Sequence, residues 1–223
     1  MPTHQSLTRS SDEDLLQRMI ATHGERFAAT FWTFFAADVG PRLPARPVIV
    51  DLGCGPGLLL RDLGERYPDA TLYGYDVTSA MIDYARQLAF KPATPTFALH
   101  DVAAKALPHA PGTVHLVSMS SVLHVFDEPL ETLAEIRRVL APGGIFLLND
   151  WIRQPLSVYL AYRRDVMKET GPDALRKAFR LFPMQNKFTA DDWRWLLGAG
   201  GFEVLSQEEL RASHRIFVAT PTR

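Results

Sequence analysis

The stretch V-I-V-D-L-G-C-G-P-G, residues 48–57, decides how the surrounding chain folds. It starts as an apolar, β-branched run, which is typical of a parallel strand buried on both faces. The run ends at Asp51 and passes through Gly53, Gly55 and Gly57 into a helix-like sequence. Glycines take positive φ and leave main-chain amides open to a ligand, and a helix start adds positive potential. The pattern predicts a strand, a ligand-binding glycine turn and a helix, with a plain connection as the alternative.

Composition limits the class of protein. With 223 residues, 47% of them hydrophobic, the chain fits one globular domain. A net charge of −1 with scattered Lys and Arg argues against a nucleic-acid partner. The aromatic run 27–39 is much shorter than the roughly 20 residues that cross a bilayer. A single cysteine, Cys54, forms no internal disulfide, so we expect a reducing, cytoplasmic location without membrane contact.

A second short strand, residues 70–76, ends in the carboxylate of Asp76 and precedes a helix over 79–89. A strand, helix and strand with this connection length run parallel, which places Asp76 beside the glycine turn. A carboxylate there can accept two hydrogen bonds from a ribose diol. The alternative is an ordinary capping or solvated aspartate.

Three further strands are predicted at 96–100, 114–120 and 145–148, with a helix from Pro129 to Leu140 before the last of them. Asp101 follows the third strand and can receive an adenine amino proton, while the Val102 amide pairs with a ring nitrogen. Alternatively Asp101 only begins a turn. Upstream, residues 11–20 and 27–35 carry helical apolar stripes.

These pieces resemble a class I methyltransferase that uses S-adenosylmethionine. The matching segments are V-I-V-D-L-G-C-G-P-G at 48–57, Y-G-Y-D at 73–76, H-D-V at 100–102 and R-R-V-L-A-P-G-G-I-F-L-L at 137–148. They follow the order of that family. A nicotinamide-dependent dehydrogenase is the nearest competitor, but its fingerprint requires a glycine where this chain has Leu58.

The resemblance implies a Rossmann-like α/β fold: a doubly wound, seven-stranded, mostly parallel sheet with one antiparallel strand. The segments 201–206 and 214–220 fit its terminal antiparallel hairpin. We expect one methyltransferase domain with an N-terminal helical cap (1–44), a cofactor-binding core (45–150), a helical substrate lid (151–188) and a C-terminal helix and hairpin (189–223).

The resemblance also implies which residues bind the cofactor, with S-adenosylhomocysteine as product. Asp51 and the glycines would hold the methionine part, Asp76 the ribose and Asp101 the adenine. The full expected set is Asp51, Gly53, Cys54, Gly55, Gly57, Asp76, Val77, Asp101, Val102 and Ser120. The chain has S-S-V-L-H at 120–124, where many nucleobase and amide methyltransferases have a D/N-P-P-Y type motif. A small-molecule acceptor is therefore favoured.

An oxygen acceptor is the leading hypothesis, with nitrogen or carbon methylation and non-methylating cofactor binding as alternatives. A hydroxyl acceptor benefits from a base. His124 is the first candidate base, Asp150 can orient it, and His23 is a third. Each can equally be structural. Too few acids converge for a metal, so none is predicted.

The acceptor is expected to contact aromatic and basic side chains of the lid and the N-terminal helices. Arg153 or Arg163 can pair with a carboxylate or phenolate. The alternative is that the lid aromatics form a lid core or a homodimer surface. The expected acceptor-binding residues are Trp32, His124, Trp151, Tyr159 and Arg163.

Overall fold

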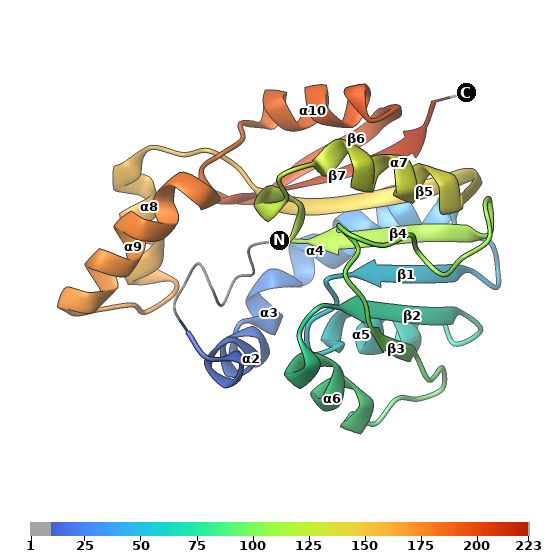
Figure 1. Ribbon diagram of the computed structural model, residues 1–223, viewed down its shortest axis with the longest axis horizontal. Coiled ribbons are helices and arrows are strands. Elements are labelled where there is room, and N and C mark those ends of the chain that lie inside the picture. The colour runs from blue at the N-terminus through green and yellow to red at the C-terminus, as the bar shows by residue number, and fades with distance from the viewer. Residues whose placement is uncertain (1–9, 223) are drawn as a thin grey trace.

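The apolar run at 48–52 forms an inner strand of a seven-stranded sheet in the computed structural model, which describes residues 10–222 (Figure 1). Residues 1–9 of the expected N-terminal cap and residue 223 lie outside the described residues. The strands are β1 (Val48–Leu52), β2 (Thr71–Asp76), β3 (Thr96–Leu99), β4 (Val114–Ser120), β5 (Leu140–Trp151), β6 (Phe202–Arg211) and β7 (His214–Pro221).

The sheet order is β3-β2-β1-β4-β5-β7-β6, and β7 alone runs antiparallel to its neighbours. The predicted mostly parallel sheet with one antiparallel strand is confirmed. Strand order reverses between β1 and β4, and ligands of such sheets bind outside the carboxyl ends of the strands at that point. Because β7 is antiparallel, the turn that joins β6 to β7 lies at this same edge.

Helices cover both faces, and each strand divides its side chains between two cores. The helices are α2 (Asp12–Ala21), α3 (His23–Arg26), α4 (Ala29–Phe34), α5 (Leu58–Arg66), α6 (Ser79–Gln87), α7 (Pro129–Val139), α8 (Leu156–Asp165), α9 (Pro172–Gln185) and α10 (Ala190–Ala199). On β1, Ile49 packs into the core beneath α4, α5 and α6, whereas Val50 and Leu52 pack into the core beneath α7 and α10. This alternation explains the continuous apolar run.

The N-terminal helices follow the sequence prediction with one correction. A capping box at Ser11 starts α2, with the Asp14 amide donating to Ser11 Oγ (3.1 Å). The predicted helix through Phe27 and Phe35 is broken. Phe27 ends α3, and α4 then continues into a π-helical turn (η1, Phe35–Val39) and a 3-10 turn (η2, Gly40–Arg42). The aromatic rings still pack together, since Phe27 and Phe31 lie 4.9 Å apart.

The fifth strand is longer than predicted. Leu140 already pairs with Val114, and the strand extends to Trp151 because β7 pairs with it as far as His214. Pro142-Gly143-Gly144 lies at an irregularity inside β5, where Gly143 has a φ of 75°.

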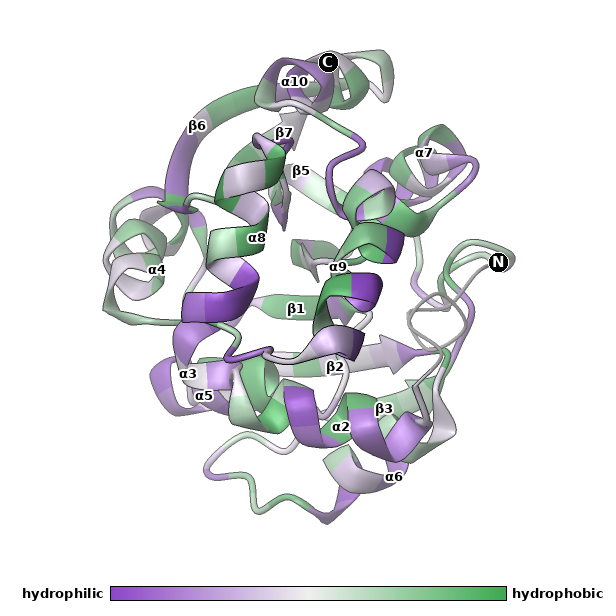
Figure 2. Cartoon of the chain, turned by 90° about the vertical axis from the view of Figure 1, so that its left-hand side faces the viewer, coloured by the Kyte–Doolittle hydropathy of each residue, from purple (hydrophilic) through white to green (hydrophobic). Residues whose placement is uncertain are grey.

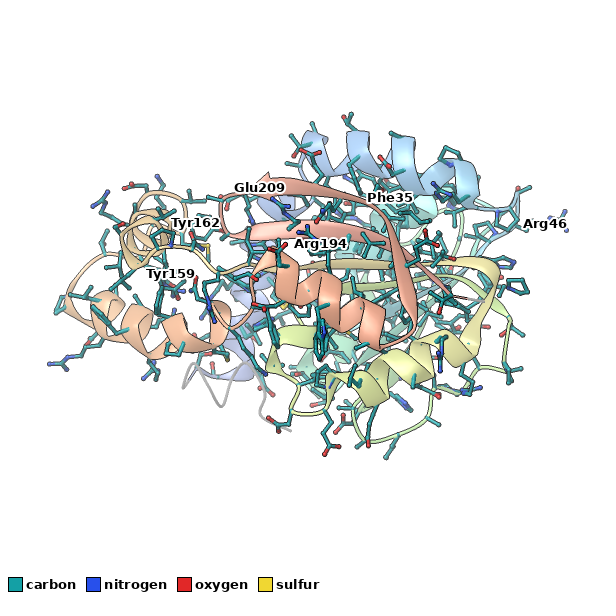
Figure 3. All side chains as sticks on the ribbon, turned by 90° about the horizontal axis from the view of Figure 1, so that it is seen from above. Phe35, Arg46, Tyr159, Tyr162, Arg194 and Glu209 are labelled. Atoms are coloured by element: carbon teal, nitrogen blue, oxygen red, sulfur yellow. The ribbon has the colours of Figure 1, made fainter. Side chains whose placement is uncertain are left out.

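Helices α8 and α9 form a separate layer beyond the carboxyl ends of the strands, at the left of Figure 1. Figure 2, which looks at this side, shows α8 and α9 running in front of β1 and β2, with α2 and α3 below them. The lid has its own small core, which contains Trp151, Tyr159, Tyr162 and Ala178. Figure 3 shows Tyr159 and Tyr162 within this layer. Among residues 10–222, no helix is both long and apolar enough to cross a bilayer.

Candidate active site

The glycine turn after β1 is required by close packing as well as by backbone conformation. Gly53 and Gly55 have φ of 70° and 52°. A Cβ on Gly53 would lie 2.4 Å from Val122 Cγ2, and a Cβ on Gly55 would lie 2.4 Å from Met19 Cε. Helix α2 therefore lies directly against the turn. Gly57 plays a different part, because its missing Cβ accommodates Phe97 and Ala85 where α6 and β3 pack.

Asp76, at the end of β2, is joined to the glycine turn as predicted. The Gly55 amide donates to its Oδ2 (2.9 Å), and the Thr78 amide donates to its Oδ1 (2.8 Å). Burial raises the pKa of Asp76 above its usual 3.8, although these amide hydrogen bonds counteract the shift. The Thr78 side chain and the Val77 amide add further hydrogen bonds to the same carboxylate.

One cavity extends from this turn to the lid, with an empty volume of about 1240 Å³ that includes its open mouth. The strand ends, the N-terminal helices, the segment after β4, the lid and the β6–β7 turn all contribute to its wall. Its lining residues are Leu15, Arg18, Met19, Thr22, Arg26, Gly53, Tyr75, Asp76, Val77, Thr78, Met81, His100, Val102, Ser120, Ser121, Val122, Val125, Phe126, Trp151, Tyr162, Arg163, Met167, Leu181, Gln185, Arg211 and His214.

Several of the expected cofactor-binding residues do not line the cavity. Asp51 is 3% exposed and accepts a hydrogen bond from Ser118 Oγ (2.6 Å). Burial raises the pKa of Asp51 to about 7. Cys54 is buried beside it, and burial raises the pKa of its thiol. Asp101 accepts from the Ala103 amide (3.0 Å), so it initiates a turn, while Val102 lines the cavity.

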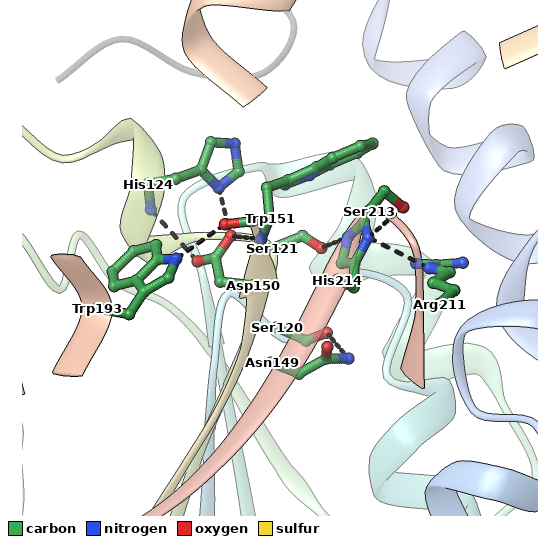
Figure 4. Close-up of polar contacts among 10 residues, drawn as sticks. All are labelled: Ser120, Ser121, His124, Asn149, Asp150, Trp151, Trp193, Arg211, Ser213 and His214. Carbon is green, nitrogen blue, oxygen red and sulfur yellow. Dashed lines mark hydrogen bonds and ion pairs between the residues drawn. The ribbon is translucent and has the colours of Figure 1, made fainter. Parts of the chain in front are cut away.

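His124 and Asp150 form the pair that the sequence suggested. His124 Nδ1 lies 2.7 Å from Asp150 Oδ1, and the His124 amide donates to Asp150 Oδ2 (3.3 Å; Figure 4). Asp150 also accepts from the Trp151 amide (2.7 Å). Both side chains are buried, however, and His124 is absent from the cavity lining, whereas Val122 and Val125 contribute to it. The two hydrogen bonds of this pair connect the turn η3 (Leu123–Val125) to the end of β5.

Two expected acceptor contacts are corrected by the structure. Trp32 packs away from the cavity, where the Arg66 guanidinium carbon lies 3.6 Å from its ring centroid. Tyr159 is fully buried in the lid core, and its hydroxyl donates to Gln185 Oε1 (2.6 Å). Both corrections have one cause. An amphipathic helix pattern shows which side chains are buried, but it does not show against which surface.

Two further basic candidates, Arg153 and His23, are not among the residues that line the cavity. Arg153 donates to the main-chain oxygens of Asn186 and Lys187, and so ties β5 to the end of α9. His23 Nε2 lies 2.7 Å from Asp62 Oδ2, which joins α3 to α5. Trp151 and Arg163 do line the cavity.

The β6–β7 turn brings functional candidates that the sequence reasoning missed. Arg211 Nε donates to His214 Nδ1 (3.2 Å), and Ser121 Oγ lies 3.1 Å from His214 Nε2 (Figure 4). An arginine Nε–H can only donate, so the pattern assigns the tautomer with the proton on Nε2. Burial and the nearby charges of Arg211 and Arg26 lower the pKa of His214 well below 6.5, which keeps the imidazole neutral.

The wall of the cavity fits S-adenosylmethionine. Asp76 offers carboxylate oxygens for a ribose diol, and Val77, Met81 and Val102 provide apolar contacts for a flat ring. Gly53 lines the cavity at the turn where the methionine part would lie.

Comparisons with known proteins agree with this fit. Residues 50–148 match the methyltransferase domain family. A malonyl-[acyl-carrier protein] O-methyltransferase of Hahella chejuensis is 35% identical over 108 residues, 48% of this chain and 38% of that protein. A trans-aconitate 2-methyltransferase of Methylobacterium radiotolerans is 35% identical over 116 residues, 51% of this chain and 42% of that protein. The matched segments thus cover about two fifths of the length of each of these two relatives.

The fold is shared with solved methyltransferases along nearly the whole chain. The plantazolicin methyltransferase BpumL in complex with SAH superposes with a TM-score of 0.74 at 15% identity, covering 98% of this chain and 93% of that one. At this identity the likeness concerns the fold. Residues 50–148 thus match a methyltransferase domain, and the sheet topology is the fold of solved methyltransferases.

Proposed function

We propose that the protein transfers the methyl group of S-adenosylmethionine to a small organic acceptor, at an oxygen atom. The observation that carries this proposal is the single cavity that joins the glycine turn and Asp76 to the lid residues Trp151, Tyr162 and Met167. A cofactor seated on the turn shares this space with whatever the lid encloses. The names of the two relatives, malonyl-[acyl-carrier protein] O-methyltransferase and trans-aconitate 2-methyltransferase, support an acceptor that carries carboxyl groups.

When bound, S-adenosylmethionine supplies an electrophilic methyl group, and its transfer to an acceptor lone pair leaves the electrons of the broken S–CH3 bond on sulfur. The protein's part is then alignment of the acceptor and exclusion of water. Ser120, Ser121 and Val122 follow β4 and line the cavity beside Gly53, so this segment would position the acceptor. The lid wall, with Trp151 and Tyr162, would shield it from water.

His124 and Asp150 have a positioning role in this proposal. Their hydrogen bonds hold the η3 turn, which carries Val122 and Val125 to the cavity wall. A base must come within hydrogen-bond reach of the proton that it removes. Burial of His124 behind the wall supports a role in shaping the site rather than in taking a proton.

The test is incubation of the full chain with methyl-labelled S-adenosylmethionine and pools of small carboxylic acids, phenols and amines. Label is expected in the acids or phenols, and an Asp76→Asn variant should lose it. Label confined to the amines would overturn the oxygen assignment. Cofactor binding without transfer to any pool would favour the non-methylating alternative.

A further inference from the structure

The cavity wall carries an excess of positive charge. One carboxylate, Asp76, lines it among the described residues, and it belongs to the cofactor end. Four arginines line the same cavity: Arg18, Arg26, Arg163 and Arg211. A cationic surface in a half-enclosed cavity attracts anionic ligands and raises their local concentration.

Two of the four arginines have other assignments. Arg163 is paired with Glu169 and donates to Tyr159 Oη (3.0 Å) and Gln185 Oε1 (3.2 Å), so its charge is balanced within the lid. Arg18 precedes Met19, whose side chain packs on Gly55. Arg18 lies on α2, the helix that packs against the glycine turn.

Arg26 and Arg211 lie at the lid end of the cavity. Arg26 is half-buried at the end of α3, and Arg211 is half-buried at the end of β6. The Arg211 guanidinium carbon lies 5.8 Å from the ring centroid of Tyr162, a lid residue. Burial and the positive charge of Arg211 lower the pKa of Arg26 to about 10, so the Arg26 guanidinium remains charged at neutral pH. The two like charges repel each other, with Glu25 as a nearby counter-charge, and an anion bound to both would reduce that repulsion further.

The orientation of Arg211 is fixed before any ligand binds. His214 Nδ1 accepts from Arg211 Nε, and the His214 ring packs on Trp151 with ring centroids 4.2 Å apart. With Nε engaged, the two terminal nitrogens carry the remaining donors, one of which also meets the Tyr162 side chain, and such a pair of nitrogens matches a carboxylate. The same histidine reaches Ser121, so this arginine is anchored next to the segment that follows β4.

We propose that Arg26 and Arg211 bind a carboxylate of the methyl acceptor, which is therefore a small organic acid whose apolar remainder packs on Trp151, Tyr162 and Met167. This inference rests on the proposed function, because it names the class of acceptor for the same site. Arg26 and Arg211 are binding residues in it, and His214 positions Arg211.

The test uses the full chain saturated with S-adenosylhomocysteine and a set of small carboxylic acids, each paired with its uncharged primary amide. Thermal shift and calorimetry should show binding of one or more acids and no binding of the matching amides. Arg26→Gln and Arg211→Gln should each weaken acid binding about 10–100-fold, the loss expected for a charge-assisted hydrogen bond. Arg26→Lys and Arg211→Lys keep the charge and should lose less.

Arg176→Gln is the matched control, since that lid arginine is 85% exposed and lies outside the cavity lining. It should bind acids as the wild type does. The inference is wrong if no acid binds, if amides bind equally well, or if the Arg26 and Arg211 variants lose S-adenosylhomocysteine affinity to the same degree as acid affinity. Failure of the wild type to bind S-adenosylhomocysteine would instead reject the proposed function, so the two failures are separable.

Discussion

The amide of Gly55 donates a hydrogen bond to Oδ2 of Asp76, 2.9 Å away, and so joins the turn after β1 to the tip of β2. This contact places the carboxylate at the edge of the turn where a ribose would lie. It also makes Asp76 part of the turn's own structure, with a second hydrogen bond from Thr78.

Asp76→Asn is expected to weaken S-adenosylhomocysteine binding by about 1.5–3 kcal/mol, because the variant loses charge-assisted hydrogen bonds to the ribose. Calorimetric titration measures this loss. Asp83→Asn, an exposed position on the neighbouring helix α6, is the control and should leave affinity unchanged. A folded Asp76→Asn variant with wild-type affinity would remove Asp76 from the site.

Gly53→Ala tests whether close packing or backbone conformation requires the first glycine. Gly53 and Gly112 both have a φ of 70°, but a Cβ on Gly53 would lie 2.4 Å from Val122, whereas a Cβ on Gly112 would meet nothing within 4 Å. In both variants the alanine must adopt a left-handed backbone conformation, which costs roughly 1–3 kcal/mol. Only Gly53→Ala should also lose cofactor affinity, and adding Val122→Ala should restore part of the stability. Equal losses of stability at both glycines in urea unfolding would contradict the packing argument.

The His124–Asp150 pair should show strong coupling in stability. Removing either partner leaves a buried polar group without this hydrogen bond, which costs about 1–3 kcal/mol. Urea unfolding of His124→Ala, Asp150→Ala and the double variant measures the loss of unfolding free energy in each. The loss in the double variant should be well below the sum of the losses in the two single variants. Additive losses would show that the pair does not hold the η3 turn. Cofactor affinity of His124→Ala should stay near that of the wild type.

Asp51 should make stability depend on pH. Its folded-state pKa is raised from 3.8 to about 7, so folding takes up a proton between these values. The contribution of Asp51 to the free energy of unfolding therefore decreases as pH rises from about 4 to 7, and levels off above that. Asp51→Asn, which can still accept from Ser118 Oγ, should show a shallower decrease in Tm over this range. Parallel Tm profiles for the wild type and the variant would contradict the assignment.

Much of the cofactor end was predictable from the sequence, because it depends on strand ends. Parallel strands bring their carboxyl ends to one edge, so an acid after β2 and glycines after β1 must meet there. The acceptor end depends on packing between elements distant in sequence. Periodicity showed Trp32 and Tyr159 to be aromatic helix residues but not that Arg66 and the lid core cover them.

Arg211 and His214 could have been found from the predicted hairpin. An antiparallel last strand places the turn that precedes it at the carboxyl edge of the parallel strands, so charged residues in that turn are site candidates. Arg26 offered no comparable signal, since its position depends on how α3 folds against the lid side of the sheet. Arg153 and Arg163, the two arginines expected to pair with an acceptor, are held by contacts with the end of α9 and with Glu169.

Calorimetric titration of the full chain with S-adenosylmethionine, S-adenosylhomocysteine and NADH tests the central claim most directly. We expect the first two to bind at a single site and NADH to show no binding, because the turn carries Leu58 where a dinucleotide fingerprint requires glycine. Binding of NADH, or no binding of either S-adenosyl compound to folded protein, would contradict the assignment of this cavity to S-adenosylmethionine.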